Sequence, residues 1–168
     1  MPEISALLII DVQHGFINQH TSAIPALVEK EQVNYDLVWA TRLEYTAESP
    51  FLTIRKLSGF DHVYKPTELA FNVRSDARII LKHGYSAVSK EFLEELHSHN
   101  VTMIELAGMD TDQCVLATAL GLFDANITPK IIVDRCFSTG GPEAHEAGIA
   151  VLRRALGSHN LIYRESKP

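Results

Sequence analysis

The sequence predicts a three-layer α/β/α domain built on a mostly parallel β-sheet. Short apolar segments alternate with amphipathic helical segments along the chain, which is the pattern of repeated β-α units. The first apolar segment, 6–10, is continuously aliphatic, as expected for a central strand that is buried on both faces. It ends on a carboxylate, Asp11, at the position where open α/β sheets bind ligands.

The elements of the first half follow from local patterns. Residues 21–32 are predicted as a helix, because apolar side chains recur at helical spacing behind the potential N-caps Thr21 and Ser22. Apolar runs predict a second strand over 35–41 and a third over 78–81, and a short helix over 51–57 that ends at Gly59. Residues 61–76 show no sustained period, so we expect a long loop near the site.

The second half repeats the alternation. Residues 89–99 are predicted as a helix and residues 101–107 as a buried strand. The next helix is expected to begin at a cap, Thr111 or Asp112, and to end at Asn126. The remaining expected elements are a strand over 129–133, a loop over 134–142, a helix over 143–156 and a strand over 160–163.

Length and composition limit the class of protein. The 168 residues, 46% of them hydrophobic and 21% charged, suit one soluble domain that spans 1–168. The net charge of −6, without a basic run, argues against nucleic acid as a partner. Apolar runs fall far short of the ~20 residues of a membrane span, and the N-terminus does not resemble a signal peptide. We therefore expect a cytoplasmic protein that does not bind membranes.

Cys114 is the candidate nucleophile. It falls in the first turn of a predicted helix that directly follows a predicted strand. Free backbone N–H groups and the positive end of the helix dipole favour a thiolate at such a position. The same N–H groups suit an oxyanion that forms on an attacked carbonyl. The alternative is that Cys114 is a small apolar filler at the start of a helix.

Asp11 and Lys82 are the candidate partners of Cys114. In a doubly wound sheet all three residues stand at or just past the carboxyl ends of strands, along one edge. A carboxylate there can take the thiol proton and later deliver it to a leaving amine. An adjacent ammonium favours the thiolate and holds the carboxylate in place. Asp11 could instead cap a backbone N–H, and Lys82 could be a solvated surface group.

Three sequence blocks resemble the isochorismatase-like cysteine hydrolases. They are residues 6–13 around Asp11, Lys82 with 85–87, and 108–119 around Cys114. The resemblance implies a Rossmann-like, six-stranded sheet in the order 3-2-1-4-5-6. It also implies that an Asp–Lys–Cys triad hydrolyses a C–N bond of a small amide or ureido compound through a thioester.

The resemblance also implies a role for each residue. Cys114 would be the nucleophile, Asp11 the general base and then acid, and Lys82 the electrostatic partner. A cis peptide is implied between Met109 and Asp110. The oxyanion hole would combine the N–H of Cys114 with that of Asp110 or Thr111. Family members are often oligomers, so we expect a homo-oligomer.

The pocket and its metal content are less well defined by the sequence. Loop residues expected to contact substrate are Gln13, His14, Phe16 and Tyr85, with Trp39 or Phe60 as further candidates. Nicotinamidase members carry an Asp-x-His after the second strand to bind a metal, whereas this chain has no such pattern over 41–48 and only His62 nearby. We therefore predict no metal site, and we doubt nicotinamidase activity. Without a glycine-rich phosphate loop, we expect no nucleotide or other cofactor.

Three other functions remain open. An isochorismatase-type vinyl-ether hydrolase would use Asp11 as the acid and would not need Cys114. A non-catalytic binding module would keep the scaffold but carry an unreactive thiol. A thiol redox protein would need Cys136 to lie close to Cys114, because the chain has no Cys-x-x-Cys motif. Cys136 itself is predicted to pack after the fifth strand and is assigned no role.

Overall fold

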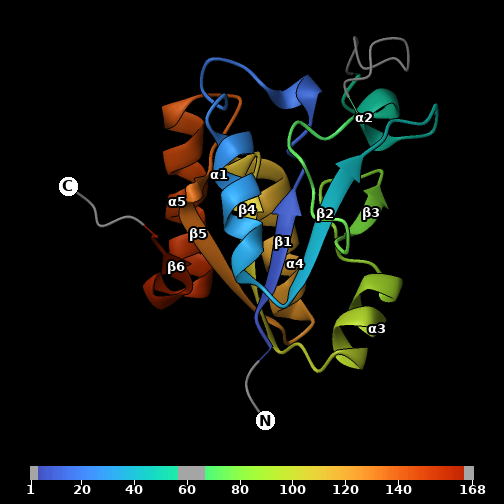
Figure 1. Cartoon of the computed structure of the whole chain (residues 1–168). Coiled ribbons are helices and arrows are strands. Elements are labelled where there is room, and N and C mark those ends of the chain that lie inside the picture. Colours follow the sequence, from blue (N-terminus) through green and yellow to red (C-terminus); the bar gives the residue numbers. More distant parts are fainter. Residues whose placement is uncertain (1–3, 57–66, 165–168) are drawn as a thin grey trace.

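The computed structural model describes residues 4–56 and 67–164, in which helices cover both faces of a six-stranded sheet (Figure 1). The strands are β1 (Ala6–Ile10), β2 (Leu37–Leu43), β3 (Arg78–Lys82), β4 (Met103–Gly108), β5 (Thr128–Cys136) and β6 (Leu161–Ile162). The α-helices are α1 (Ile24–Glu31), α2 (Pro50–Thr53), α3 (Lys90–Ser98), α4 (Leu116–Asp124) and α5 (Pro142–Leu156). Shorter helical turns are η1 (His14–Phe16), η2 (Gln32–Asn34), η4 (Thr111–Val115) and η5 (Ser158–Asn160).

The strand order is β3-β2-β1-β4-β5-β6, and each neighbouring pair is parallel. This confirms the predicted three-layer α/β/α fold and its strand order. Every ladder of the sheet is parallel, where a mostly parallel sheet was predicted. The winding reverses between β1 and β4, so the crevice at their carboxyl ends is the expected place for a ligand.

The central strand β1 supplies both halves of the core. All five of its residues are buried. Successive side chains of a strand point to opposite faces of the sheet, so β1 contributes to the core on both faces. Leu8 and Ile10 pack with side chains of α3, α4 and α5. Leu7 and Ile9 pack with side chains of α1 on the other face. The continuous aliphatic run was therefore interpreted correctly as a strand buried on both faces.

Several element boundaries differ from the predicted ones. Strand β5 continues to Cys136, so Asp134 and Arg135, predicted to lie in a loop, belong to the strand. The first helix begins at Ile24, because the Thr21 hydroxyl bonds within the preceding turn instead of capping the helix. The helical turn η4 begins after Asp110, whose side chain makes no capping bond. The predicted caps at Thr111 and Asp112 were therefore wrong.

The loop that was predicted over 61–76 is described from residue 67 onward. That described part lies beside the end of β1: the N–H of Ala70 donates to Val12 O at 2.9 Å and the N–H of His14 to Glu68 O at 2.9 Å. Residues 61–66 and Gly59, the expected end of the short helix, lie outside the described residues.

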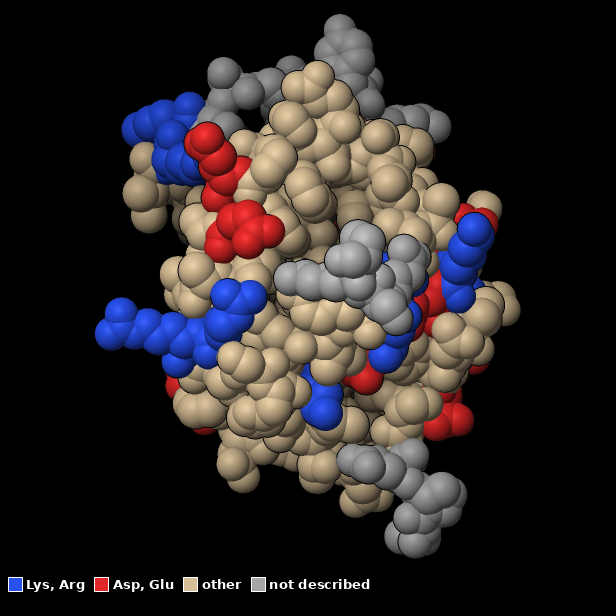
Figure 2. Space-filling model, turned by 90° about the vertical axis from the view of Figure 1, so that its left-hand side faces the viewer, with Lys and Arg blue, Asp and Glu red and all other residues tan. Residues whose placement is uncertain are grey.

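The surface on the side of α5 and β6 carries charges of both signs. Figure 2 shows that acidic and basic side chains are interspersed there, and that uncharged residues make up most of this face. Across residues 4–56 and 67–164, no helix combines the length and the apolarity that a bilayer-spanning segment needs.

Candidate active site

The structure brings Asp11, Lys82 and Cys114 together at the carboxyl edge of the sheet. Asp11 directly follows β1, Lys82 is the last residue of β3, and Cys114 lies in η4 after β4. Lys82 reaches inward across β2, so its Nζ lies 2.7 Å from Asp11 Oδ2 and 3.4 Å from Cys114 Sγ. All three residues are at most 6% exposed. Lys82 is therefore not a solvated surface group.

Asp11 is held by its neighbour on β2. The Thr41 hydroxyl donates to Asp11 Oδ1 at 2.6 Å and accepts the Asp11 backbone N–H at 2.9 Å. The backbone of Asp11 has a φ of 51°, in the left-handed region that few non-glycine residues adopt. This conformation turns the carboxylate into the crevice and leaves Oδ2 toward Lys82 and Cys114. Thr41 was not among the predicted site residues.

The Lys82 ammonium is enclosed by acceptors. Besides Asp11 and Cys114, it donates to the carbonyl oxygens of Gly84 at 2.9 Å and Tyr85 at 3.1 Å. These two carbonyls come from the turn that follows β3. A buried charge must be paired and hydrogen-bonded, and these two carbonyls complete the hydrogen bonding of the ammonium and hold it in place.

Electrostatics at Cys114 differ from the sequence-based expectation. Burial is the largest effect on the thiol, and the Asp11 carboxylate is the next; together they raise the pKa of Cys114 well above its usual range, against the lowering effect of Lys82. Desolvation and a neighbouring anion both disfavour a thiolate. The surroundings of Cys114 in the free protein thus favour the thiol, which is opposite to the direction expected from a helix start and a neighbouring ammonium.

The turn that carries Cys114 provides the candidate oxyanion hole. The peptide bond between Met109 and Asp110 is cis, at the position that the resemblance implies. The Thr111 N–H donates to Phe137 O at 3.2 Å, so Thr111 is excluded as an oxyanion donor. The backbone N–H of Asp110 has no partner among the described residues. Asp110 and Cys114 thus remain the candidate donors.

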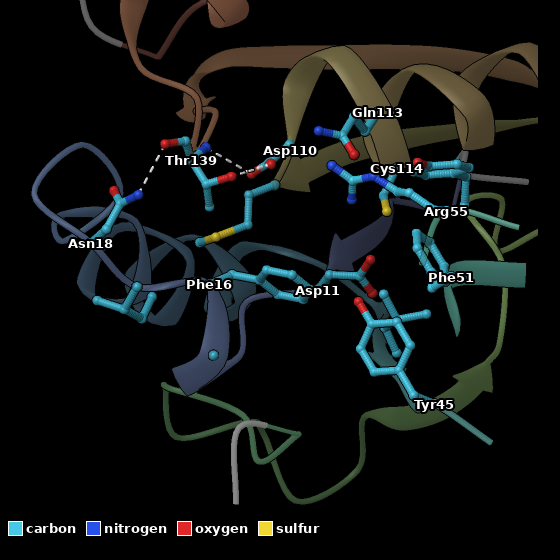
Figure 3. Close-up of a pocket in the computed structure, with 15 residues that line it drawn as sticks. Asp11, Phe16, Asn18, Tyr45, Phe51, Arg55, Asp110, Gln113, Cys114 and Thr139 are labelled. Carbon is cyan, nitrogen blue, oxygen red and sulfur yellow. Dashed lines mark hydrogen bonds between the residues drawn. The ribbon is translucent and has the colours of Figure 1, made fainter. Parts of the chain in front are cut away.

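The Asp110 side chain points away from the triad. Its carboxylate accepts hydrogen bonds from the backbone N–H of Thr139, at 2.9 Å, and from the Thr139 hydroxyl (Figure 3). Burial raises the pKa of Asp110 above its ordinary value, against the lowering effect of these hydrogen bonds. The carboxylate therefore ties the turn to the segment after β5.

A cavity of about 280 Å³ opens above Cys114 (Figure 3). This volume is near the lower end of the roughly 300–1,000 Å³ found for ligand pockets, which suits a small molecule. The wall combines apolar and aromatic side chains with polar and charged ones. The lining residues are Asp11, Gly15, Phe16, Ile17, Asn18, Leu43, Tyr45, Phe51, Arg55, Tyr85, Met109, Asp110, Gln113, Cys114 and Thr139.

The predicted substrate contacts are only partly in this wall. Phe16 and Tyr85 line the cavity, whereas His14 is exposed and lies outside it. Gln13 is fully buried and bonds the backbone of β2: its amide donates to Leu43 O at 3.1 Å and its carbonyl oxygen accepts from Leu43 N–H at 2.8 Å. Trp39 is a core residue that packs edge-on against Phe92. The structure therefore does not place Gln13, His14 or Trp39 in the wall of this cavity. Phe60 lies outside the described residues.

Several lining residues were missed. Tyr45 and Phe51 pack edge-to-face 5.1 Å apart and close one side of the cavity. Burial, together with Cys114 and Asp11, raises the pKa of Tyr45, so its hydroxyl stays protonated. Arg55 follows α2 and adds a guanidinium to the wall. The sequence carries no motif around these three residues that could have identified them.

The described residues contain no group of three or more His, Cys, Asp or Glu side chains that could hold a metal ion. Leu43, the last residue of β2, and Tyr45, which follows the strand, instead form a small apolar cluster with Phe51. His62 lies outside the described residues, so the prediction of a metal-free site stays a prediction.

Comparison with known proteins agrees with this architecture. The isochorismatase domain model matches residues 60–159. A pyrazinamidase of Pyrococcus horikoshii, solved in complex with zinc, is 20% identical and superposes with a TM-score of 0.79 over 98% of this chain and 100% of that one. An isochorismatase-like hydrolase from Alkaliphilus metalliredigens is 17% identical, with a TM-score of 0.77 over 90% of this chain and 91% of that one. A nicotinamidase from Bacillus subtilis is 20% identical, with a TM-score of 0.77 over 96% of this chain and 99% of that one.

No curated protein sequence matches the chain significantly. At these identities the solved structures show the same fold and nothing finer. The domain match, in contrast, covers more than half of the 168 residues, from a position between α2 and β3 to η5, just before β6. The chain belongs to the isochorismatase family.

Proposed function

We propose that this protein is a cofactor-free cysteine hydrolase that cleaves the C–N bond of a small amide or ureido compound. One observation carries the proposal: the Cys114 sulfur at the cavity wall lies 3.4 Å from Lys82 Nζ, which holds the Asp11 carboxylate at 2.7 Å. A nucleophile, a base and a fixed positive charge are thereby within reach of one bound carbonyl.

The first half of the reaction forms a thioester. Because the resting sulfur is a thiol, attack on the substrate carbonyl and transfer of the thiol proton to Asp11 occur together. The oxyanion that forms is placed toward the N–H groups of Asp110 and Cys114. Asp11 then returns the proton to the nitrogen, the C–N bond breaks, and the amine or ammonia leaves.

The second half consumes one water. Asp11, again a carboxylate, takes a proton from a water that attacks the thioester carbonyl. The tetrahedral intermediate collapses, the C–S bond breaks, and the proton returns to the sulfur. Lys82 keeps its proton throughout and offsets the charge that develops on Asp11 and on the sulfur. The products are a carboxylic or carbamic acid and an amine.

The test is ammonia release from a panel of small amides and ureido compounds, compared between the parent and Cys114→Ala. We expect Cys114→Ala to lower kcat by at least about 10³-fold, because no covalent route remains. Cys114→Ser serves as the control that keeps the shape of the pocket. A parent that releases no ammonia from any compound of the panel would contradict the proposal.

The same variants distinguish the alternatives. A vinyl-ether hydrolase that protonates its substrate through Asp11 would keep most of its turnover in Cys114→Ala and lose it in Asp11→Asn. A binding module would hydrolyse neither class of compound. The burial of Cys114 between two charged partners favours the amide hydrolase over both, because neither alternative requires that arrangement.

Arg55 points to a substrate with a negative group. Its side chain extends toward the cavity (Figure 3), and its charge acts on the nearby Tyr45 hydroxyl. No salt bridge joins Arg55 to a carboxylate within the described residues. The Asp11 charge is already paired with Lys82. A substrate carboxylate would therefore find an available guanidinium partner.

Paired substrates test this preference. Arg55→Gln should lower kcat/KM by about 10- to 100-fold for an amide that carries a carboxylate, since a charge-assisted hydrogen bond contributes about 1.5–3 kcal/mol. The neutral carboxamide of the same compound should be hydrolysed equally well by Arg55→Gln and the parent. Arg55→Lys, which keeps the charge, should recover part of the loss. Equal losses on both substrates would remove the carboxylate from the proposal.

A further inference from the structure

The turn that carries the nucleophile is fixed from outside the substrate cavity. Its first helical residue, Thr111, is fully buried and is absent from the cavity wall. The Thr111 hydroxyl lies 2.9 Å from Nδ1 of His145 on α5. The Thr111 N–H donates to Phe137 O at 3.2 Å. The hydroxyl and the N–H of Thr111 are thus both bonded to groups outside the cavity wall.

His145 is itself held rigidly. It is 7% exposed, and its ring stacks on that of Phe137 with 4.6 Å between centroids and 13° between planes. Burial lowers the pKa of His145 below its ordinary value, so the ring is neutral near pH 7. The stacked pair therefore meets Thr111 at two points: the imidazole at its hydroxyl and the Phe137 carbonyl at its N–H.

Helix α5 presses directly against the nucleophile turn. A Cβ at Gly148, three residues after His145 on α5, would lie 2.8 Å from the Cα and the N of Asp112. Residues three apart share a face of a helix, so the same face of α5 supplies the imidazole and the close backbone contact. The Ser138 hydroxyl adds a bond to the Asp112 carboxylate.

We propose that His145 is a positioning residue that acts through Thr111 to place the Asp110 N–H and the Cys114 sulfur for attack. His145 is absent from the wall of the substrate cavity, and it contacts the nucleophile turn at Thr111, which directly follows Asp110. Loss of the His145–Thr111 bond frees the turn at its first residue. Small displacements of reacting groups have large effects on rate. The inference rests on the proposed function for its rate readout.

The experiment compares Thr111→Val and His145→Leu, which each remove one end of the bond, with the parent. Each variant should lower kcat roughly 10- to 100-fold while KM changes by less than about twofold, because the cavity wall is intact. Thr111→Ser keeps the hydroxyl, and His145→Asn places an amide near Nδ1; both should restore most of kcat. The double variant Thr111→Val/His145→Leu should be no slower than either single variant, because the two changes remove the same bond.

A matched control separates positioning from stability. Ile149→Val removes one buried methyl group from the same helix and should cost about 0.5–1.5 kcal/mol of stability. It should leave kcat unchanged at temperatures where every variant is folded. Unchanged kcat in Thr111→Val and His145→Leu, or losses that multiply in the double variant, would overturn the inference.

A second readout does not depend on turnover. Alkylation of Cys114 by iodoacetamide, followed on the Cys114 peptide, should become at least about threefold faster in Thr111→Val and His145→Leu, because a loosened turn exposes the buried thiol more often. A parent that hydrolyses no amide but shows this dependence would refute the proposed function and support the positioning role. Alkylation rates equal to the parent's, in variants of unchanged kcat, would refute the positioning role alone.

Discussion

At the scale of single residues, the charges around Cys114 decide which proton moves. A thiol near the start of a helix and beside a lysine is expected to ionise easily. Here the lysine is already paired with Asp11, and burial removes the water that a thiolate needs. The net result is a raised pKa for Cys114. In the proposed mechanism, the thiol proton therefore moves to Asp11 during attack and not before it.

The variant Asp11→Asn tests this arrangement. Asp11 raises the pKa of Cys114 through its charge and through its hydrogen bond to the thiol, so removing the charge should lower that pKa. At pH 8 a larger fraction of Cys114 is then thiolate, and iodoacetamide alkylation should be faster than in the parent. Turnover should nevertheless be lost, because no base remains. The measurement is the alkylation rate of the Cys114 peptide against pH.

The variant Lys82→Met should shift the pKa of Cys114 in the opposite direction. Lys82 lowers the pKa of Cys114, so its loss should shift the alkylation profile to higher pH. Two variants that abolish turnover should thus move the same titration in opposite directions. If the Asp11→Asn profile also moved to higher pH, the assignment of Asp11 as the group that keeps Cys114 protonated would have to be abandoned.

At the scale of secondary-structure elements, the sequence predicted what depends on local pattern. The run 6–10 and the apolar spacing after Cys114 were sufficient for β1 and for the helix that begins at the nucleophile turn. Parallel strands align their carboxyl ends, and for that reason Asp11, Lys82 and Cys114 could be placed on one edge. Their contacts in the structure follow from this topology and from the reach of a lysine side chain.

The missed features depend on contacts between distant segments. Asp134 and Arg135 were predicted in a loop with the turn-forming residues that follow them, yet Arg135 forms a 3.3 Å ion pair with Glu31 of α1 and remains in β5. The Thr111 N–H, a predicted candidate for the oxyanion hole, is bonded to the Phe137 carbonyl, 26 residues further along the chain. Arg55 reaches the cavity only because α2 packs over the end of β2. None of these partners is near in sequence, so no local pattern reports them.

At the scale of the whole molecule, the triad and a cluster of ion pairs around Arg164 lie toward opposite ends of the strands. The triad stands at the carboxyl ends of the strands. Toward their amino ends, Arg164 bonds Glu31 of α1 at 2.7 Å and also contacts Glu105 of β4 and the Tyr35 hydroxyl. Glu31 is only 5% exposed. This cluster connects the residues after β6 with α1 and with the centre of the sheet.

The variant Arg164→Ala should destabilise the fold without changing the chemistry. It leaves the buried Glu31 with Arg135 and the Tyr35 hydroxyl, and it leaves Glu105 without its guanidinium. Because Arg164 is about one-third exposed, we expect a loss of about 1–3 kcal/mol in the free energy of unfolding, less than for a fully buried pair. Urea unfolding measures this loss.

Arg154→Ala, which removes an exposed arginine on α5, is the control and should change stability by less than about 0.5 kcal/mol. Turnover per folded molecule should equal the parent's in both variants, since neither side chain approaches the triad. A lower kcat in folded Arg164→Ala would show that the Arg164 cluster and the triad are coupled and would contradict their independence.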